Sequence, residues 1–296
     1  MLPGSTPATP GGRAAVAPLF VGGTGRSGTT IAAQILGQHP DLALVPIELR
    51  FHVDAGGLCD VAAGRTDVAT FEEKLRRLWF WRPPNNSGPR GIHVVAEESA
   101  LDAGLARLHE ACEADPWGAC RQFMDDLLQP FVERAGARSW VEMTPPNGKR
   151  ADALCRMFPD ARVVHMVRDG RDVASSVARR SWGPDDTLSA LTWWRQGMTR
   201  IGQSMSKADP DRVRTIRLES LVVSRREEEY AGLLEFAGVT DSEPVRRFFD
   251  DEVAAGSLHA GSWRGGLDEA QVREVEDAYE RALAQLAAKG IQLPPA

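Results

Sequence analysis

The sequence has few cysteines and no long apolar run. Its four cysteines are Cys59, Cys112, Cys120 and Cys155, and none of them forms a Cys-x-x-Cys pair. This pattern favours reduced thiols over a disulfide framework or a zinc site, and we expect no metal. No stretch reaches the roughly 18 to 20 consecutive apolar residues that a membrane helix requires. We therefore predict a soluble protein with no membrane partner.

A basic excess is also absent. The 296 residues carry a formal net charge of −6, whereas proteins that coat nucleic acid usually carry an excess of lysine and arginine, so we expect no nucleic-acid partner. The first 18 residues are rich in proline and glycine, and they lack the basic start and apolar block of a secretory signal. We predict a disordered leader over residues 1–18 and one domain over 19–296, in the cytoplasm.

Strand and helix patterns alternate along the chain. Apolar runs at 19–21, 139–142, 162–167 and 213–218 are typical of buried strands. Apolar residues at helical spacing follow at 31–36, 188–205 and 272–286, residues 103–135 are largely helical in pattern, and 83–89 has the composition of a loop. This order predicts an α/β protein: a three-layer sandwich with a central, mostly parallel sheet flanked by helices.

The turn after the first strand has the composition of an anion site. It reads Thr24-Gly25-Arg26-Ser27-Gly28-Thr29-Thr30 and leads into a helix. Unpaired N–H groups and the helix dipole favour a phosphate there, while the hydroxyls and the arginine add donors. A nucleotide triphosphatase loop would need a Gly-Lys-[Ser/Thr] sequence, which this turn lacks. Gly23, Gly25 and Gly28 match a dinucleotide fingerprint, but Asp41 and Glu48 are only loosely placed as its ribose-binding acid.

A second polar element follows the strand at 162–167. Arg168 stands at the end of this strand, and Ser176 and Arg180 follow it eight and twelve residues later. Ser176 and Arg180 are four residues apart and share one face of a helix, where they could bind a second phosphate together with Arg168. The alternative is a surface helix whose arginines pair with Asp169 and Asp172.

Together the two elements resemble the sulfotransferases that use 3′-phosphoadenosine-5′-phosphosulfate (PAPS). Gly25 to Thr30 looks like the 5′-phosphosulfate loop in the arginine form of tyrosylprotein and many bacterial members, and Arg168 to Ser176 looks like the 3′-phosphate motif. The resemblance covers Leu19 to Arg180 and, more weakly, Thr215 to Trp263. It implies a fold like that of P-loop nucleotide triphosphatases.

The resemblance also implies roles for individual residues. The 5′-phosphosulfate would be held by Gly25, Arg26, Ser27, Gly28, Thr29 and Thr30, and the 3′-phosphate by Arg168, Ser176 and Arg180. Ser262 and Arg264 stand in a segment similar to the late Gly-x-Trp loop that closes over the nucleotide. Leu218 stands where an aromatic residue is common.

The acceptor side is predicted from the segment Pro46-Ile-Glu-Leu-Arg50. Glu48 is the first choice for the general base, because the tyrosylprotein-type enzymes carry a catalytic glutamate there, followed two residues later by an arginine. His52 and then Glu142 are the reserves, and Arg26 would stabilise the leaving oxygen. Met143 stands where many relatives have a lysine, so Arg26 or Lys149 would have to compensate. Arg50, His52 and Thr144 are predicted to contact the acceptor.

The leading hypothesis is an enzyme that transfers the sulfuryl group of PAPS to a hydroxyl, with an amine as the second choice. The acceptor is expected to be a small molecule, under a helical lid at about 82–136, and the sequence is compatible with a homo-oligomer. A P-loop nucleotide kinase and a non-catalytic nucleotide-binding protein are the alternatives.

Overall fold

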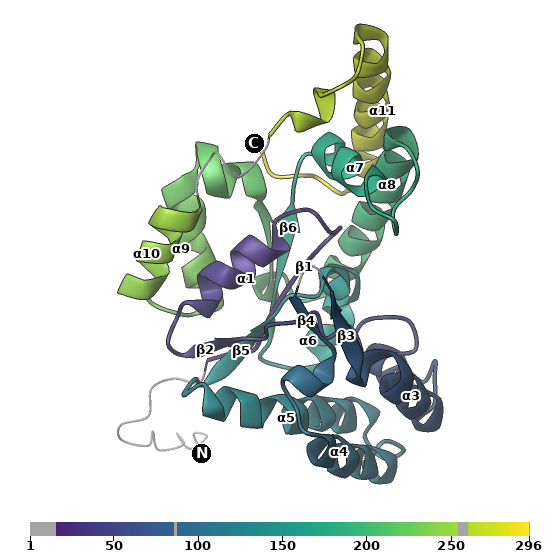
Figure 1. The fold of residues 1–296 in the computed structure, drawn as a ribbon, viewed down its shortest axis with the longest axis vertical. Coiled ribbons are helices and arrows are strands. Elements are labelled where there is room, and N and C mark those ends of the chain that lie inside the picture. Colours follow the sequence, from purple (N-terminus) through teal and green to yellow (C-terminus); the bar gives the residue numbers. More distant parts are fainter. Residues whose placement is uncertain (1–15, 86–87, 254–259, 296) are drawn as a thin grey trace, which may run out of the picture.

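A parallel five-stranded sheet forms the centre of the computed structural model, which describes residues 16–85, 88–253 and 260–295 (Figure 1). The strand order is β2-β5-β1-β6-β7, and each neighbouring pair is parallel. The strands are β1 (Leu19–Gly23), β2 (Leu42–Leu44), β5 (Ser139–Glu142), β6 (Arg162–Val167) and β7 (Val213–Arg217). Because all five run in one direction, their carboxyl ends meet at one edge, where open α/β sheets bind ligands.

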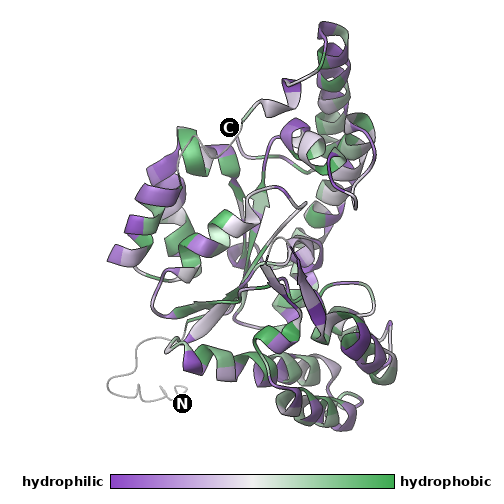
Figure 2. Ribbon diagram, in the orientation of Figure 1, coloured by the Kyte–Doolittle hydropathy of each residue, from purple (hydrophilic) through white to green (hydrophobic). Residues whose placement is uncertain are grey.

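Helices cover both faces of this sheet. Side chains alternate along a strand, so Leu19 and Val21 of β1 pack in the core with α1 and α9, whereas Phe20 packs in the core with α5 and α6. A third cluster joins α7, α8 and α11 beyond the end of β6 (Figure 1). Figure 2 shows the apolar residues gathered on the strands and on inner helix faces. The predicted three-layer α/β sandwich is confirmed.

The helices follow the expected alternation with the strands. The longer ones are α1 (Thr29–Gly37), α4 (Glu98–Ala111), α5 (Pro116–Arg134), α7 (Gly170–Ala178), α8 (Thr187–Met205), α9 (Arg226–Ala237), α10 (Glu243–Glu252) and α11 (Glu269–Ala287). Shorter ones are α2 (Leu58–Ala62), α3 (Val68–Lys74), α6 (Ala151–Met157), η1 (Leu75–Phe80), η2 (Ile92–Val94), η3 (Pro145–Arg150), η4 (Pro210–Arg212), η5 (Ser220–Ser224) and η7 (Ser262–Arg264).

Three details differ from the sequence-based expectations. The segment predicted as a loop at 83–89 is a two-stranded antiparallel hairpin of β3 (Arg82–Asn85) and β4 (Gly88–Arg90), with residues 86–87 outside the described part. The edge strand β2 has only three residues and no sequence signal of its own. The acidic run Glu227-Glu228-Glu229 has the sequence pattern of a solvated helix face, but Glu229 is buried and lies 3.6 Å from Arg214.

Residues 1–15 of the predicted leader, which spans residues 1–18, lie outside the described part of the chain. Val16 already packs against the core around α1, and the carbonyl of Pro18 accepts a hydrogen bond from the Arg162 amide at 3.0 Å. The packed chain therefore includes the last three positions assigned to the leader. Within the described ranges, no helix is both long and apolar enough to cross a membrane.

Candidate active site

The turn between β1 and α1 lies at the carboxyl edge of the sheet. Its backbone has positive φ at Gly25 (82°), Arg26 (58°) and Gly28 (93°). Gly28 also has no room for a side chain, because an added Cβ would lie 2.6 Å from the Leu218 side chain. Leu218 therefore packs directly on the turn where α1 begins.

The hydroxyl of Ser27 has the properties of a ligand-binding group. Its Oγ is buried and makes no hydrogen bond to the described residues, which is costly for a buried polar atom. Thr29 is buried and Thr30 exposed in the first turn of α1. Because the amides of this first turn and the helix dipole also favour an anion, the turn fits a phosphate group.

Arg26 joins the two sequence motifs. Its Nε donates a hydrogen bond of 3.1 Å to Ser176 Oγ on α7, across 150 residues of sequence. Partial burial lowers the pKa of Arg26, and the nearby charges of Arg180, Arg168 and Arg179 lower it further. Among the residues that the structure describes, Arg179 donates to Ser175 Oγ alone, at 2.7 Å. Four guanidinium groups thus gather in one place, an arrangement that strongly favours a bound anion.

The predicted alternative, in which the arginines on and beside α7 pair with nearby aspartates, holds for two of them. Arg171 lies 2.6 Å from Asp169, and Arg168 lies 3.7 Å from Asp172. In contrast, Arg26, Arg179 and Arg180 form no ion pair with a carboxylate in the described part of the chain. The excess positive charge therefore lies on the side of α7 that faces the β1–α1 turn.

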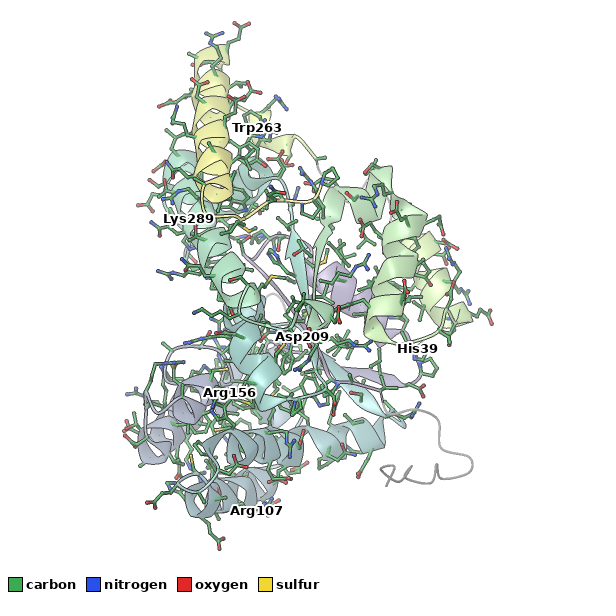
Figure 3. The ribbon with its side chains drawn as sticks, turned by 180° about the vertical axis from the view of Figure 1, so that it is seen from behind. His39, Arg107, Arg156, Asp209, Trp263 and Lys289 are labelled. Carbon is green, nitrogen blue, oxygen red and sulfur yellow. The ribbon has the colours of Figure 1, made fainter. Side chains whose placement is uncertain are left out.

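Asp172 fixes the late Gly-x-Trp segment on α7. Its carboxylate accepts hydrogen bonds from the amides of Gly261 at 2.9 Å and Trp263 at 3.2 Å. Ser262 Oγ is 3.4 Å from the same carboxylate, and Arg264 donates to Glu276 on α11 at 2.8 Å. Figure 3 shows Trp263 beside α11. Ser262 and Arg264, both predicted to contact the nucleotide, thus have protein partners here.

Glu48 and Arg50 lie next to one another after β2. Arg50 Nη1 donates to Glu48 Oε2 at 2.9 Å, and Arg50 Nε donates to Asp54 at 2.8 Å. Burial raises the pKa of Glu48, Arg50 opposes this, and the negative charges of Glu142 and Asp54 add to it. A half-exposed carboxylate with a raised pKa is suited to proton transfer.

The backbone that carries Glu48 is strained and held by a buried network. Arg50 has a φ of 63°, unusual for a residue with a side chain. The Leu49 amide donates to Glu142 Oε1 at 3.1 Å, and the Arg50 amide to Thr144 Oγ1 at 3.3 Å. These two bonds fix the position of the Glu48 segment against the end of β5.

Glu142 is the centre of that network. It is buried, it accepts hydrogen bonds from Asn147 Nδ2 at 2.6 Å and from the amide and hydroxyl of Thr144, and it lies 3.2 Å from His52 Nε2. Its pKa is lowered: burial raises it, but the His52 ring and these donors outweigh burial. Asn147 also donates to the Val21 carbonyl of β1 at 3.1 Å. The network therefore links the Glu48 segment (46–50) to β1, the strand before the candidate phosphate turn (25–30).

This arrangement affects two residues predicted to contact the acceptor. His52 and Thr144 are buried, and both belong to the network around Glu142. Their place in the structure favours a role in positioning the Glu48 segment. The sequence pattern did not single out Asp172 or Asn147 for these roles, because Asp172 binds Gly261 and Trp263 and Asn147 binds His52 and Val21, all distant in the sequence. Asp54, only four residues from its partner Arg50, was not singled out either. Among the described residues, no group of three or more His, Cys, Asp or Glu side chains is placed to hold a metal ion.

The fold and the turn define an α/β protein whose β1–α1 turn, at the carboxyl edge of its sheet, is suited to binding a phosphate. Comparison with known proteins identifies the class more closely: the profile of the Sulfotransferase family matches residues 18–243. The chain belongs to the sulfotransferase family, as its motifs predicted.

Individual relatives agree with this assignment. The nodulation protein NoeE of Sinorhizobium fredii is 26% identical over 295 residues, covering 87% of this chain; the chain spans 62% of the length of that relative. Among solved structures, the sulfotransferase domain of the Synechococcus PCC 7002 olefin synthase superposes with a TM-score of 0.51 at 17% identity, over 98% of this chain and 100% of that domain. The sulfotransferase domain of the curacin biosynthetic pathway superposes with a TM-score of 0.51 at 18% identity, over 94% of this chain and 99% of that domain. At such identities the structures establish the fold.

Proposed function

We propose that this protein transfers the sulfuryl group of PAPS to a hydroxyl of a small molecule, leaving adenosine-3′,5′-bisphosphate. The observation that carries the proposal is the contact between Arg26 and Ser176, within a group of arginines that includes Arg168 and Arg180. This contact brings the two motifs, one for each phosphate of the nucleotide, to the same place. An amine acceptor is the second choice.

Each end of the nucleotide would have its own set of donors. The β1–α1 turn, from Gly25 to Thr30, would bind the 5′-phosphosulfate through its amides and the Ser27 hydroxyl, which has no other partner among the described residues. Arg168, Ser176 and Arg180 would bind the 3′-phosphate through charge-assisted hydrogen bonds. Ser262 and Arg264 would act through the segment that Asp172 holds on α7.

Glu48 is the proposed general base. PAPS supplies a sulfuryl group on a good leaving nucleotide, and the protein must remove the proton of the acceptor and stabilise the leaving oxygen. Glu48 can accept that proton, because its carboxylate is half-exposed and its pKa is raised. Arg50 orients the carboxylate, and Arg26 would donate to the leaving oxygen from the other side.

The geometry favours Glu48 over the two reserve bases. Glu142 and the His52 ring are buried, and each carries hydrogen bonds that hold the site together. Protonation of Glu142 on Oε1 would disturb the bonds from the Leu49 amide and the Thr144 hydroxyl. Protonation on Oε2 would disturb those from the Thr144 amide and Asn147. We assign both residues to positioning, together with Thr144.

The segment 82–136 remains our proposal for the acceptor-side lid, with one fixed part. The buried side chains of α5, among them Phe123, Met124 and Leu127, belong to the main core. We therefore treat α5 as a fixed part of the fold that does not move with the lid. The hairpin of β3 and β4 carries few buried groups. Replacing the β3–β4 hairpin by a hairpin of different sequence should change the KM for the acceptor and leave the affinity for the nucleotide unchanged.

A calorimetric titration with adenosine-3′,5′-bisphosphate, 5′-AMP and Mg-ATP tests the proposal. Each charge-assisted contact to the 3′-phosphate contributes about 1.5–3 kcal/mol, so AMP should bind at least about tenfold more weakly than the bisphosphate. Equal or tighter binding of Mg-ATP would contradict the proposal and favour a nucleotide kinase. Bisphosphate binding without any turnover of PAPS would favour a non-catalytic nucleotide-binding protein.

A further inference from the structure

Lys149 is a cation that the proposed reaction leaves without a role. It stands on η3 and is only partly exposed, and its ammonium makes no hydrogen bond or ion pair within the described ranges. Its neighbours in the chain place it firmly: a Cβ at Gly148 would lie 3.3 Å from Ile201 of α8, and Arg150 Nε donates to the Val53 carbonyl at 3.3 Å. Lys149 therefore lies between α8 and the segment that carries Glu48.

The charges around Lys149 leave a positive excess. Burial lowers the pKa of Lys149, Arg200 and Arg50 lower it further, and Asp54 opposes them. Arg50 is already paired with Glu48 and Asp54, whereas Arg200 has no carboxylate partner in the described part of the chain. Arg200 is exposed and Lys149 is partly buried, so this surface carries positive charge that an anion entering from solvent would stabilise.

This positive group differs from the one on the nucleotide side. The charges that act on Arg26 are those of Arg168, Arg179 and Arg180, and Lys149 is not among them. Conversely, the charges that act on Lys149 come from the Glu48 segment and α8. Lys149 thus lies on the side of the proposed base, where the acceptor must bind.

Aromatic side chains adjoin the same cations. Trp193, Gly197 and Arg200 are spaced by four and three residues and share one face of α8. Gly197 approaches the phosphate turn, since a Cβ there would lie 3.3 Å from Thr24, and Lys149 Nζ lies 6.0 Å from the Trp193 ring centre. Trp182, whose surface is 59% exposed, lies 6.1 Å from Trp193 between ring centres. This face of α8 therefore carries flat apolar surface and positive charge, beginning at the phosphate turn.

We propose that the acceptor is an aromatic compound with an anionic group of its own, such as a carboxylate. Its ring would pack on Trp193 and Trp182, and its anion would bind Lys149 and Arg200, which directs the hydroxyl toward Glu48. The inference rests on the proposed function, because it assigns the acceptor of the same reaction. The alternative, that Lys149 replaces the cation absent at Met143 and assists the leaving nucleotide, is an outcome of the test.

Acetylation of Lys149 provides a readout that needs no known acceptor. The chain has only four lysines, at 74, 149, 207 and 289, and Lys207 and Lys289 are exposed on other parts of the protein (Lys289 in Figure 3), so they serve as internal standards. The rate of acetylation by acetic anhydride would be measured by mass spectrometry with saturating adenosine-3′,5′-bisphosphate. Benzoate, 4-hydroxyphenylacetate and 3-(4-hydroxyphenyl)propionate would then be added, each beside its neutral amide.

We expect the nucleotide alone to change the rate of Lys149 acetylation by less than about twofold relative to the free protein. At least one aromatic acid at millimolar concentration should slow that rate about fivefold or more, and its neutral amide should have no effect. Arg200→Gln should weaken this protection, whereas Arg195→Gln, on another face of α8, should not. Protection by the nucleotide alone would place Lys149 on the leaving-group side and overturn the proposal. Equal protection by acid and amide, or none by any acid, would overturn it as well. Loss of bisphosphate binding in calorimetry would instead contradict the proposed function.

Discussion

At the scale of single residues, the chemistry depends on which carboxylate can change its protonation state. Glu142 and Glu48 both belong to the segment around the carboxyl end of β5 and β2, but their surroundings differ. Glu142 is buried among donors that keep it ionised, while Glu48 is half-exposed and its pKa is raised. The same physical rule therefore supports the proposal that Glu142 has a structural role and Glu48 a catalytic one.

Replacing Glu48 by Gln should abolish proton transfer without weakening nucleotide binding. We expect the rate of PAPS turnover to fall about 100-fold or more, since a positioned base commonly contributes that much. The release of bisphosphate with water as acceptor gives the rate, and calorimetry gives the affinity. Glu235→Gln, an exposed carboxylate on α9, is the matched control. An unchanged rate in Glu48→Gln would rule out this base.

The pH dependence of the same rate gives an independent check. Glu48 acts only when deprotonated, and its pKa is raised above 4.5, so activity should fall as the pH drops through that raised value. Arg50→Gln removes a positive neighbour that lowers this pKa, so the acidic limb should move to higher pH. A limb that stays in place would show that another group controls the rate.

Ser176 allows the two phosphates to be distinguished. Ser176→Ala removes one donor from the proposed 3′-phosphate site, so affinity for the bisphosphate should fall about tenfold and affinity for 5′-AMP should stay unchanged. Ser175→Ala, one position earlier, is the control, because its hydroxyl already accepts from Arg179. Equal losses for both nucleotides would mean that Ser176 acts through Arg26, at the 5′ end.

At the scale of elements, the start of α1 depends on the packing of Leu218 against Gly28. Gly28→Ala meets both a positive φ of 93° and a Cβ position 2.6 Å from Leu218. Gly25→Ala meets only a positive φ of 82°, with open space around it. We expect Gly25→Ala to lower the free energy of unfolding by about 1 kcal/mol and Gly28→Ala by about 2–4 kcal/mol. Urea unfolding measures both, and equal losses would contradict the role of Leu218.

Sequence patterns were sufficient for the elements whose signal is local. The apolar runs at 139–142 and 162–167 became β5 and β6, because a buried parallel strand needs a continuous apolar run. The three-residue strand β2 was not predicted, since its strand character comes from pairing with β5. The hairpin at 82–90 was hidden by Pro83 and Pro84, which weaken a strand pattern although an isolated hairpin tolerates them.

The candidate site follows the same rule. The turn at Gly25–Thr30 and the Arg168–Ser176 element could be predicted, because each is a contiguous motif. The carboxylates that organise the site could not, since Asp172 and Glu142 act through residues about 90 positions away, Gly261 and Trp263 in one case and Leu49 in the other. Only the folded chain brings those groups together.

At the scale of the whole molecule, stability should depend on pH through a histidine in the sheet. His165 lies on β6, between β1 and β7, and burial lowers its pKa to about 4 from an ordinary 6.5. The folded protein keeps the ring neutral, while the unfolded chain binds a proton below pH 6.5. Stability should therefore be full above pH 6.5 and decline as the pH falls toward 4, by about 3 kcal/mol in total.

Urea unfolding at a series of pH values tests this dependence. His165→Gln should flatten the decline between pH 6.5 and 4, whereas Val164→Ala, on the same strand, should lower stability equally at every pH in that range. Glu142 acts in a different window: its pKa is lowered, so its contribution is present above about pH 4.5 and is lost only as the pH falls further. Glu142→Gln should therefore change the slope below pH 4.5 and leave the slope above it intact. A decline above pH 4.5 that persists in His165→Gln would mean that other groups control the acid stability of the fold.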